Sequence, residues 1–144
     1  MLKPGYEMTV QEEQNTLKAC QQLEELVSKK ASAHEISFAF RLLSSGMKIP
    51  KDMDHDFSAL FYGMALESIS SVILQESIKR FARGEVEEIS KVFMPSASEL
   101  ASYCKKLELE LLSKVKTIHK AIMNTRAKAE RGNIVLLNQS KAIA

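Results

Sequence analysis

The chain has 144 residues, of which 45% are hydrophobic and 26% are charged, a composition typical of a folded globular protein and not of a disordered one. Five Gly and three Pro are too few for the many tight turns of a β-sandwich or a β-barrel. Leu, Ala, Glu, Lys, Ser and Met dominate instead, and most of these residues favour helices. We therefore expect an all-α protein, a helical bundle around a central apolar helix.

Capping boxes open the first two predicted helices. The stretches Thr9–Glu12 and Ser32–Glu35 have the spacing in which a hydroxyl accepts a hydrogen bond from a backbone amide and the Glu reaches back to the cap residue. The first helix should cover residues 9–29. The second should cover residues 33–45 and stop at Gly46, because Gly commonly follows the last residue of a helix.

The third predicted helix, residues 56–83, is apolar on nearly every side. Asp54 or Asp56 can accept hydrogen bonds from its first amides, and Gly84 marks its end. A helix that is apolar all round is usually buried. We expect this helix to be the central one, with the following apolar residues: Phe57, Leu60, Phe61, Met64, Leu66, Ile69, Val72, Ile73, Ile78 and Phe81.

The fourth predicted helix covers residues 97–131. Pro95 and a third capping box, Ser96–Glu99, mark its start. At about 100° per residue its apolar side chains form one narrow stripe, roughly 80° wide: Leu100, Cys104, Leu107, Leu111, Val115, Ile118, Ile122, Thr125 and Ala129. The whole would be one helical domain over residues 1–131, followed by a flexible tail over residues 132–144.

This last helix is long for the size of the chain. It would span about 50 Å, whereas a compact globule of this length has a radius of gyration of about 15 Å. Its distal end should therefore protrude, or form a coiled coil with a second copy in a homodimer, since a narrow stripe suits a two-helix seam. The candidate partner-binding residues on the stripe are Leu107, Leu111, Ile118 and Ile122.

The charge is distributed unevenly along the chain. Residues 1–113 hold 13 Lys and Arg against 17 Asp and Glu, a balance of −4, while residues 114–144 hold seven against Glu130 alone, a balance of +6. Such asymmetry indicates an anionic partner, either nucleic acid or an acidic protein surface, although solvated helix faces also carry basic runs.

Two groups of cations are candidates for nucleic-acid binding. Lys105, Lys116, Lys120 and Arg131 lie opposite the apolar stripe of the last helix. Arg80 and Arg83 flank Phe81, a combination that could hold phosphates and stack a base. The simpler interpretation of the second group is structural, because cations in a last helical turn complement the helix dipole and Phe81 continues the core stripe.

No pattern in the chain indicates catalysis or a bound metal. The stretch Asp52–Asp56 has the alternating carboxylates of a calcium loop, but the turn position that needs Gly is Phe57, and Gly63 stands where a bidentate Glu is required. Helix capping explains these acids better. The His residues belong to no ligand motif, and GxSxG and Gly-rich phosphate loops are missing. We expect a protein that is not an enzyme, with no catalytic residues, no metal and no cofactor.

The two Cys and the N-terminus suggest the compartment. Cys20 and Cys104 are far apart and form no CxxC pair, so reduced thiols are expected. The first residues contain no apolar signal segment, and the longest apolar-rich stretch, residues 57–66, is roughly half of what a membrane span needs. We expect a cytoplasmic protein without a membrane contact.

Four stretches together carry a resemblance to a known family: Tyr62–Leu66, Glu76–Gly84, Phe93–Ser96 and Glu99–Leu100. Their order, an aromatic helix, a Gly stop, a Pro-Ser step and an acidic-leucine helix start, resembles the small helical domains of phage replication accessory proteins, particularly helicase loaders. The resemblance covers about residues 35–106. It implies a non-enzymatic adaptor that binds a replicative helicase, with or without DNA, and it carries no catalytic residue to this chain.

These observations favour an interaction protein of phage or prophage DNA replication. Its helical body would dock a protein partner such as a replicative helicase, and its basic last helix would add affinity for nucleic acid. The alternative is a self-associating structural helical protein with no nucleic-acid role.

Overall fold

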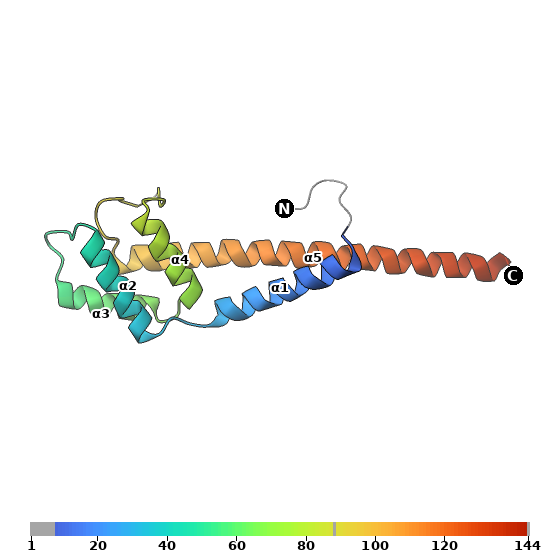
Figure 1. Cartoon of the computed structure of the whole chain (residues 1–144), viewed down its shortest axis with the longest axis horizontal. Coiled ribbons are helices and arrows are strands. Elements are labelled where there is room, and N and C mark those ends of the chain that lie inside the picture. Colours follow the sequence, from blue (N-terminus) through green and yellow to red (C-terminus); the bar gives the residue numbers. More distant parts are fainter. Residues whose placement is uncertain (1–7, 88, 144) are drawn as a thin grey trace. The chain divides into compact units, whose positions relative to one another are not determined.

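The computed structural model of the chain describes residues 8–87 and 89–143, with residues 133–143 as backbone only. It contains the helices α1 (Val10–Ser28), α2 (Ala33–Gly46), α3 (His55–Leu66), α4 (Ser71–Ala82) and α5 (Ala97–Ile143) (Figure 1). No β-strand occurs in this part of the chain. The predicted all-α class is confirmed.

The chain divides into two compact units. Unit 1 consists of residues 1–22 and 112–144, and unit 2 consists of residues 23–111. Both α1 and α5 contribute residues to each unit. The sequence predicts one domain over residues 1–131, and the structure gives two units with buried side chains of their own.

Unit 1 is a pair of helices, the first part of α1 and the distal part of α5. Cys20 on α1 is buried, as are Val115 and Ile122 on α5. An ion pair joins the same two helices, with Arg126 Nε 3.1 Å from Glu13 Oε2. Part of the apolar stripe of α5 is therefore covered by the chain itself.

Unit 2 holds most of the buried apolar side chains. Its α2 packs against both α3 and α4, and the segments on either side of α4 add further buried residues. The largest fully buried apolar side chains are Tyr62, Leu66, Ile69, Leu74, Pro95, Leu100 and Cys104.

The predicted helix starts are present in the structure. Thr9 Oγ1 accepts from the amide of Glu12 at 3.1 Å, and the reciprocal bonds of a complete capping box join Ser32 to Glu35. Ser96 and Glu99 form the same pair of bonds at 3.1 and 3.2 Å. Of the two candidate caps for α3, Asp54 performs the role, because its Oδ1 accepts from the amides of Asp56 and Phe57.

The helix predicted over residues 56–83 is wrong as a single element, because it is broken between α3 and α4. The amide of Ser71 donates to the carbonyl of Lys29 at 2.9 Å, and the carbonyl of Ile69 accepts from the amide of Ala31 at 2.8 Å. Backbone groups that pair with another segment cannot also continue a helix. Ser70 takes an extended conformation at the N-cap of α4, in keeping with the preference of Ser for helix starts.

The other difference concerns the end of α5. The sequence predicts a stop at Arg131 and a flexible tail over residues 132–144, but the backbone stays helical to Ile143. Gly132 does not have a positive φ angle, and a single Gly inside a helix costs only about 1 kcal/mol relative to Ala. With no Pro behind it, Gly132 does not terminate the helix.

The predicted stop at Gly84 is confirmed. Its φ angle is 66°, a left-handed conformation that residues with a Cβ adopt only at a cost. The amide of Gly84 donates to the carbonyl of Phe81, and that of Glu85 donates to the carbonyl of Arg80. These two bonds form a Schellman motif, which satisfies carbonyls at the end of α4.

The two glycines give opposite expectations for the same substitution. Gly84→Ala should lower the free energy of unfolding by about 1–2 kcal/mol, because Ala is strained in the left-handed region. Gly132→Ala should raise the helix stability by up to about 1 kcal/mol, since a Cβ there meets no atom within 4 Å. Thermal unfolding followed by circular dichroism measures both. A destabilised Gly132→Ala variant would contradict the continuous helix.

Candidate protein-binding site on α3

The outer side of α3 exposes a row of large apolar side chains. Phe57, Leu60, Phe61 and Met64 are 62%, 61%, 60% and 70% exposed, respectively. Their spacing of three and four residues places them on one side of the helix. We call these four residues the α3 apolar face. A contiguous exposed apolar patch on a folded protein commonly marks a surface that binds another protein.

The inner side of α3 is held by Tyr62. Its side chain is 1% exposed, and its hydroxyl donates to the carbonyl oxygen of Pro95. The ring of Phe40 on α2 meets the Tyr62 ring edge-on at 4.9 Å. Burial, with a contribution from the nearby carboxylate of Glu99, raises the pKa of Tyr62 well above its ordinary value. The phenol therefore stays protonated, as its role as donor requires.

A hollow of about 770 Å³ lies beside the α3 apolar face. Its walls come from residues 50–53, from α3, and from residues 94–99 at the start of α5. Met53, Met64 and Met94 contribute three thioether side chains to this lining. Because Met is unbranched and flexible, such a lining adapts to the shape of an apolar group that enters it.

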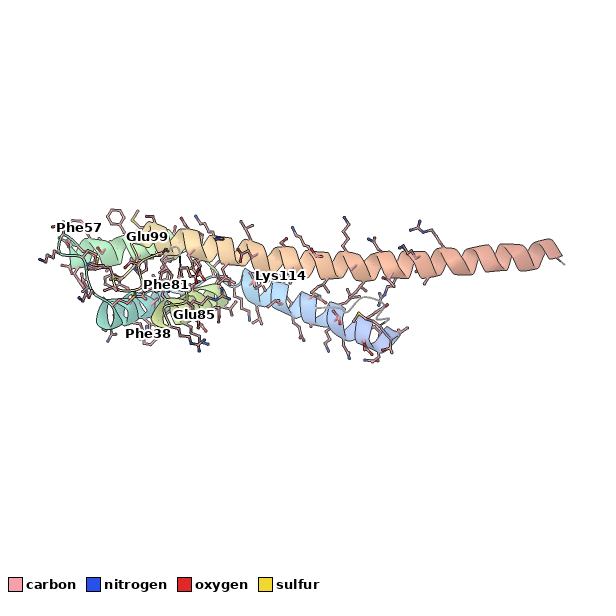
Figure 2. The ribbon with its side chains drawn as sticks, turned by 90° about the horizontal axis from the view of Figure 1, so that it is seen from above. Phe38, Phe57, Phe81, Glu85, Glu99 and Lys114 are labelled. Carbon is pink, nitrogen blue, oxygen red and sulfur yellow. The ribbon has the colours of Figure 1, made fainter. Side chains whose placement is uncertain are left out.

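Two of the residues that line the hollow are acidic, Asp52 and Glu99. Asp54 and Asp56 follow Asp52 in the sequence, at the start of α3. No Lys or Arg occurs from residue 52 to residue 78. Phe57 and Glu99 lie on one side of unit 2, whereas Phe38 and Glu85 lie on another (Figure 2). A partner at this site would therefore meet an apolar centre with a negatively charged rim.

The six residues predicted to bind nucleic acid are divided between the two units. Lys116, Lys120 and Arg131 are exposed in unit 1. Lys105, Arg80 and Arg83 belong to unit 2. Arg80 is held by an ion pair with Glu76 at 3.2 Å and by a hydrogen bond to the Tyr103 hydroxyl at 3.3 Å.

Phe81, between the two arginines, has the structural role. It is buried and meets the Tyr103 ring edge-on at 5.4 Å. It therefore offers no free face on which a base could stack. Arg83 is exposed at the end of α4, where a cation complements the helix dipole.

The residues predicted to bind a protein partner through α5 differ in accessibility. Leu107 and Leu111 are half-buried in unit 2. In unit 1, Ile118 is 39% exposed, whereas Ile122 is only 3% exposed. Ile122 is thus covered within the chain, which removes it from the surface open to a partner.

The buried Cys104 behaves as a core residue. Burial raises the pKa of its thiol to about 11, and its Sγ donates to Ser77 Oγ at 3.3 Å. A thiol held neutral in this way is a poor nucleophile. Among the described residues, no cluster of His, Cys, Asp and Glu could hold a metal ion. In the same part of the chain, the helices are too short or too polar to cross a membrane.

Comparisons of this chain with protein-family models, with curated proteins and with solved structures found no match.

Sequence reasoning missed the α3 apolar face because it treated residues 56–83 as one buried helix. A signal for the correct assignment was present. Three acids precede Phe57, and the apolar residues at positions 57, 60, 61 and 64 follow a helical spacing that leaves out Tyr62 and Leu66. Two apolar sides on one short helix indicate one core side and one side open to a partner.

The two sides of α3 should respond differently to substitution. Tyr62→Phe leaves the buried carbonyl of Pro95 without its donor and should lower the free energy of unfolding by about 1–2 kcal/mol. Phe61→Gln should change it by less than about 0.5 kcal/mol, because exposed positions away from special features tolerate substitution. Urea unfolding of both variants is the measurement. If Phe61→Gln destabilised the fold as much as Tyr62→Phe, the outer side of α3 would belong to the core.

Proposed function

We propose that this protein is a non-enzymatic adaptor of phage or prophage DNA replication, which docks a replicative helicase through the α3 apolar face and the hollow beside it. The observation that carries the proposal is the row of four large apolar side chains, each at least 60% exposed, on a helix whose other side is packed. Such an exposed row favours association, because burial of its apolar surface against a partner removes that surface from water.

The composition of the hollow supports docking in preference to catalysis. Its lining includes the hydroxyls of Ser58, Ser96 and Ser98 and the carboxylates of Asp52 and Glu99, and no His, Cys, Lys or Arg belongs to this lining. A nucleophilic Ser needs a general base within hydrogen-bond reach. Ser96 and Glu99 are already engaged in capping α5, so we assign these groups to the structure of the rim.

The helicase is proposed as the partner because three of the four stretches that carry the family resemblance contribute to this site, all except residues 76–84. Tyr62 and Pro95 are joined by a hydrogen bond, and both line the hollow together with Met94, Ser96 and Glu99. Residues about 30 positions apart in the chain thus build one surface. We further propose that the exposed cations of α5 in unit 1 add affinity for nucleic acid, and that the protein acts in the cytoplasm, where the replication machinery works.

Self-association is the second candidate function. The same α3 apolar face could be covered by a second copy of the chain, and Ile118 on α5 offers a further exposed apolar group. In that case the protein would be a homodimer, and no other protein would bind at this site. The oligomeric state of the variants below separates the two candidates.

A double substitution tests the proposal. Phe61→Gln/Met64→Gln should weaken binding to the purified replicative helicase of the same phage or host at least tenfold, because central apolar anchors dominate protein interfaces. Phe38→Gln is the matched control: Phe38 on α2 is 55% exposed but lies on another side of unit 2 (Figure 2), so binding should be unchanged. Isothermal titration calorimetry gives the affinities.

Two results would contradict the docking of a helicase through the α3 apolar face. Equal loss of binding in the Phe38→Gln control would place the contact elsewhere on unit 2. A wild-type dimer in light scattering that becomes a monomer in Phe61→Gln/Met64→Gln, with no helicase binding by either protein, would assign the face to self-association.

A further inference from the structure

The distal part of α5 carries a second surface of different chemistry. Within unit 1, Lys116, Lys120, Lys128 and Arg131 are all exposed. At about 100° per residue they occupy an arc of roughly 120° on the side opposite the buried Val115 and Ile122. We call these four residues the basic face of α5. Figure 2 shows nitrogen-tipped side chains on the side of this part of α5 that faces away from α1.

No carboxylate interrupts the basic face. The acidic residue of segment 112–132, Glu130, falls outside the 120° arc, about 40° from its edge at Lys116. Glu13 on α1 is paired with Arg126, which lies next to the buried side of the helix. Among the side chains that the structure describes, none forms an ion pair with these four cations. Their charges add along about 22 Å of helix.

The residues between the cations permit close approach. Thr117, Asn124 and Ala127 lie within the same arc and have short side chains. An α-helix fits the major groove of duplex DNA, which is about 12 Å wide. Short side chains between the cations would allow the helix to enter the groove while the long Lys and Arg side chains reach the phosphates.

The absence of aromatic residues decides between duplex and single-stranded nucleic acid. Proteins that bind single strands combine cations with aromatic side chains on which the bases stack. Residues 8–22 and 112–144, which make up almost all of unit 1, contain no Phe, Tyr or Trp. Such a surface can contact phosphates but cannot hold unstacked bases, so it should prefer the polymer with the higher charge density, which is the duplex.

We propose that unit 1 binds duplex nucleic acid along the basic face of α5, with its four cations neutralising phosphates and without reading the base sequence. This inference rests on the nucleic-acid role proposed above for α5 and does not depend on helicase docking. An acidic protein surface would also attract these cations, but it carries a lower and less regular charge than the one charge per 1.7 Å of a duplex.

Fluorescence anisotropy with the full chain tests the proposal. The probes are a labelled 20-base-pair DNA duplex and each of its single strands, titrated at several salt concentrations. The duplex should bind at least fivefold more tightly than either strand. Its logarithmic salt slope should be about −3.6, because four neutralised phosphates each contribute about −0.9.

Variants locate the contact. Lys116→Ala/Lys120→Ala should reduce the magnitude of the duplex salt slope by about two units with unchanged helix content, since Ala is a strong helix former. Lys79→Ala/Arg83→Ala removes two exposed cations from the end of α4 and is the charge-matched control, for which the slope should stay the same.

Each other outcome overturns a defined part of the proposal. Equal or tighter binding of the single strands would overturn the preference for duplex and leave a general nucleic-acid role. Absence of binding to every probe at low salt would overturn that role as well, with helicase docking unaffected. Displacement of the duplex by poly-glutamate at equal charge would assign the basic face to an acidic protein. A smaller salt slope for duplex binding in Lys79→Ala/Arg83→Ala, with no change in Lys116→Ala/Lys120→Ala, would place the contact on unit 2.

Discussion

The backbone pairing between residues 29–31 and 69–71 decides how unit 2 is built. Its two hydrogen bonds, from Ala31 to Ile69 and from Ser71 to Lys29, interrupt what would otherwise be one apolar helix. Glu35 reinforces the same junction, because its carboxylate completes the capping box of α2 and also accepts from the Ser71 hydroxyl. The hydrogen bond from Ser71 is the largest cause of a lowered pKa of Glu35, and the bond from the Ser32 amide is the second. Because the helix is broken here, α2 can pack against α3 and α4 separately.

The site follows from this break together with contacts that are distant in sequence. Once α3 is separate, Tyr62 and Leu66 face the core while Phe57 and Phe61 face outward. The Tyr62 hydroxyl then ties α3 to Pro95. A second backbone pairing, in which Lys48 exchanges hydrogen bonds with Val92 and Met94 at 2.9 Å, holds the other wall of the hollow. The hollow thus lies between residues 50–53, α3 and residues 94–99. Directional hydrogen bonds hold these three segments in place.

The sequence predicts those features of this fold that depend on neighbouring residues. Capping boxes at Ser32 and Ser96 and the left-handed Gly84 are local patterns, and each appears where it was expected. The break near Ser70 depends on pairing with residues 40 positions away, and no window of helical periodicity contains that information. The sequence did not predict the candidate site for the same reason, since the exposure of Phe57 and Met64 follows from the break. Gly132 is the converse case, in which a residue that often ends helices meets no competing partner and the helix continues.

The two proposed surfaces use interactions that respond to salt differently. Burial of the α3 apolar face is a hydrophobic contribution, about 25 cal/mol per Å² of apolar surface removed from water, and screening by salt does not weaken it. Phosphate binding by the basic face of α5 depends on the release of counterions and therefore falls steeply with salt concentration. Each surface also lies within its own unit of the chain. Substitutions in one surface should accordingly leave the chemistry of the other intact, so the two proposed activities, protein docking and nucleic-acid binding, can be tested separately.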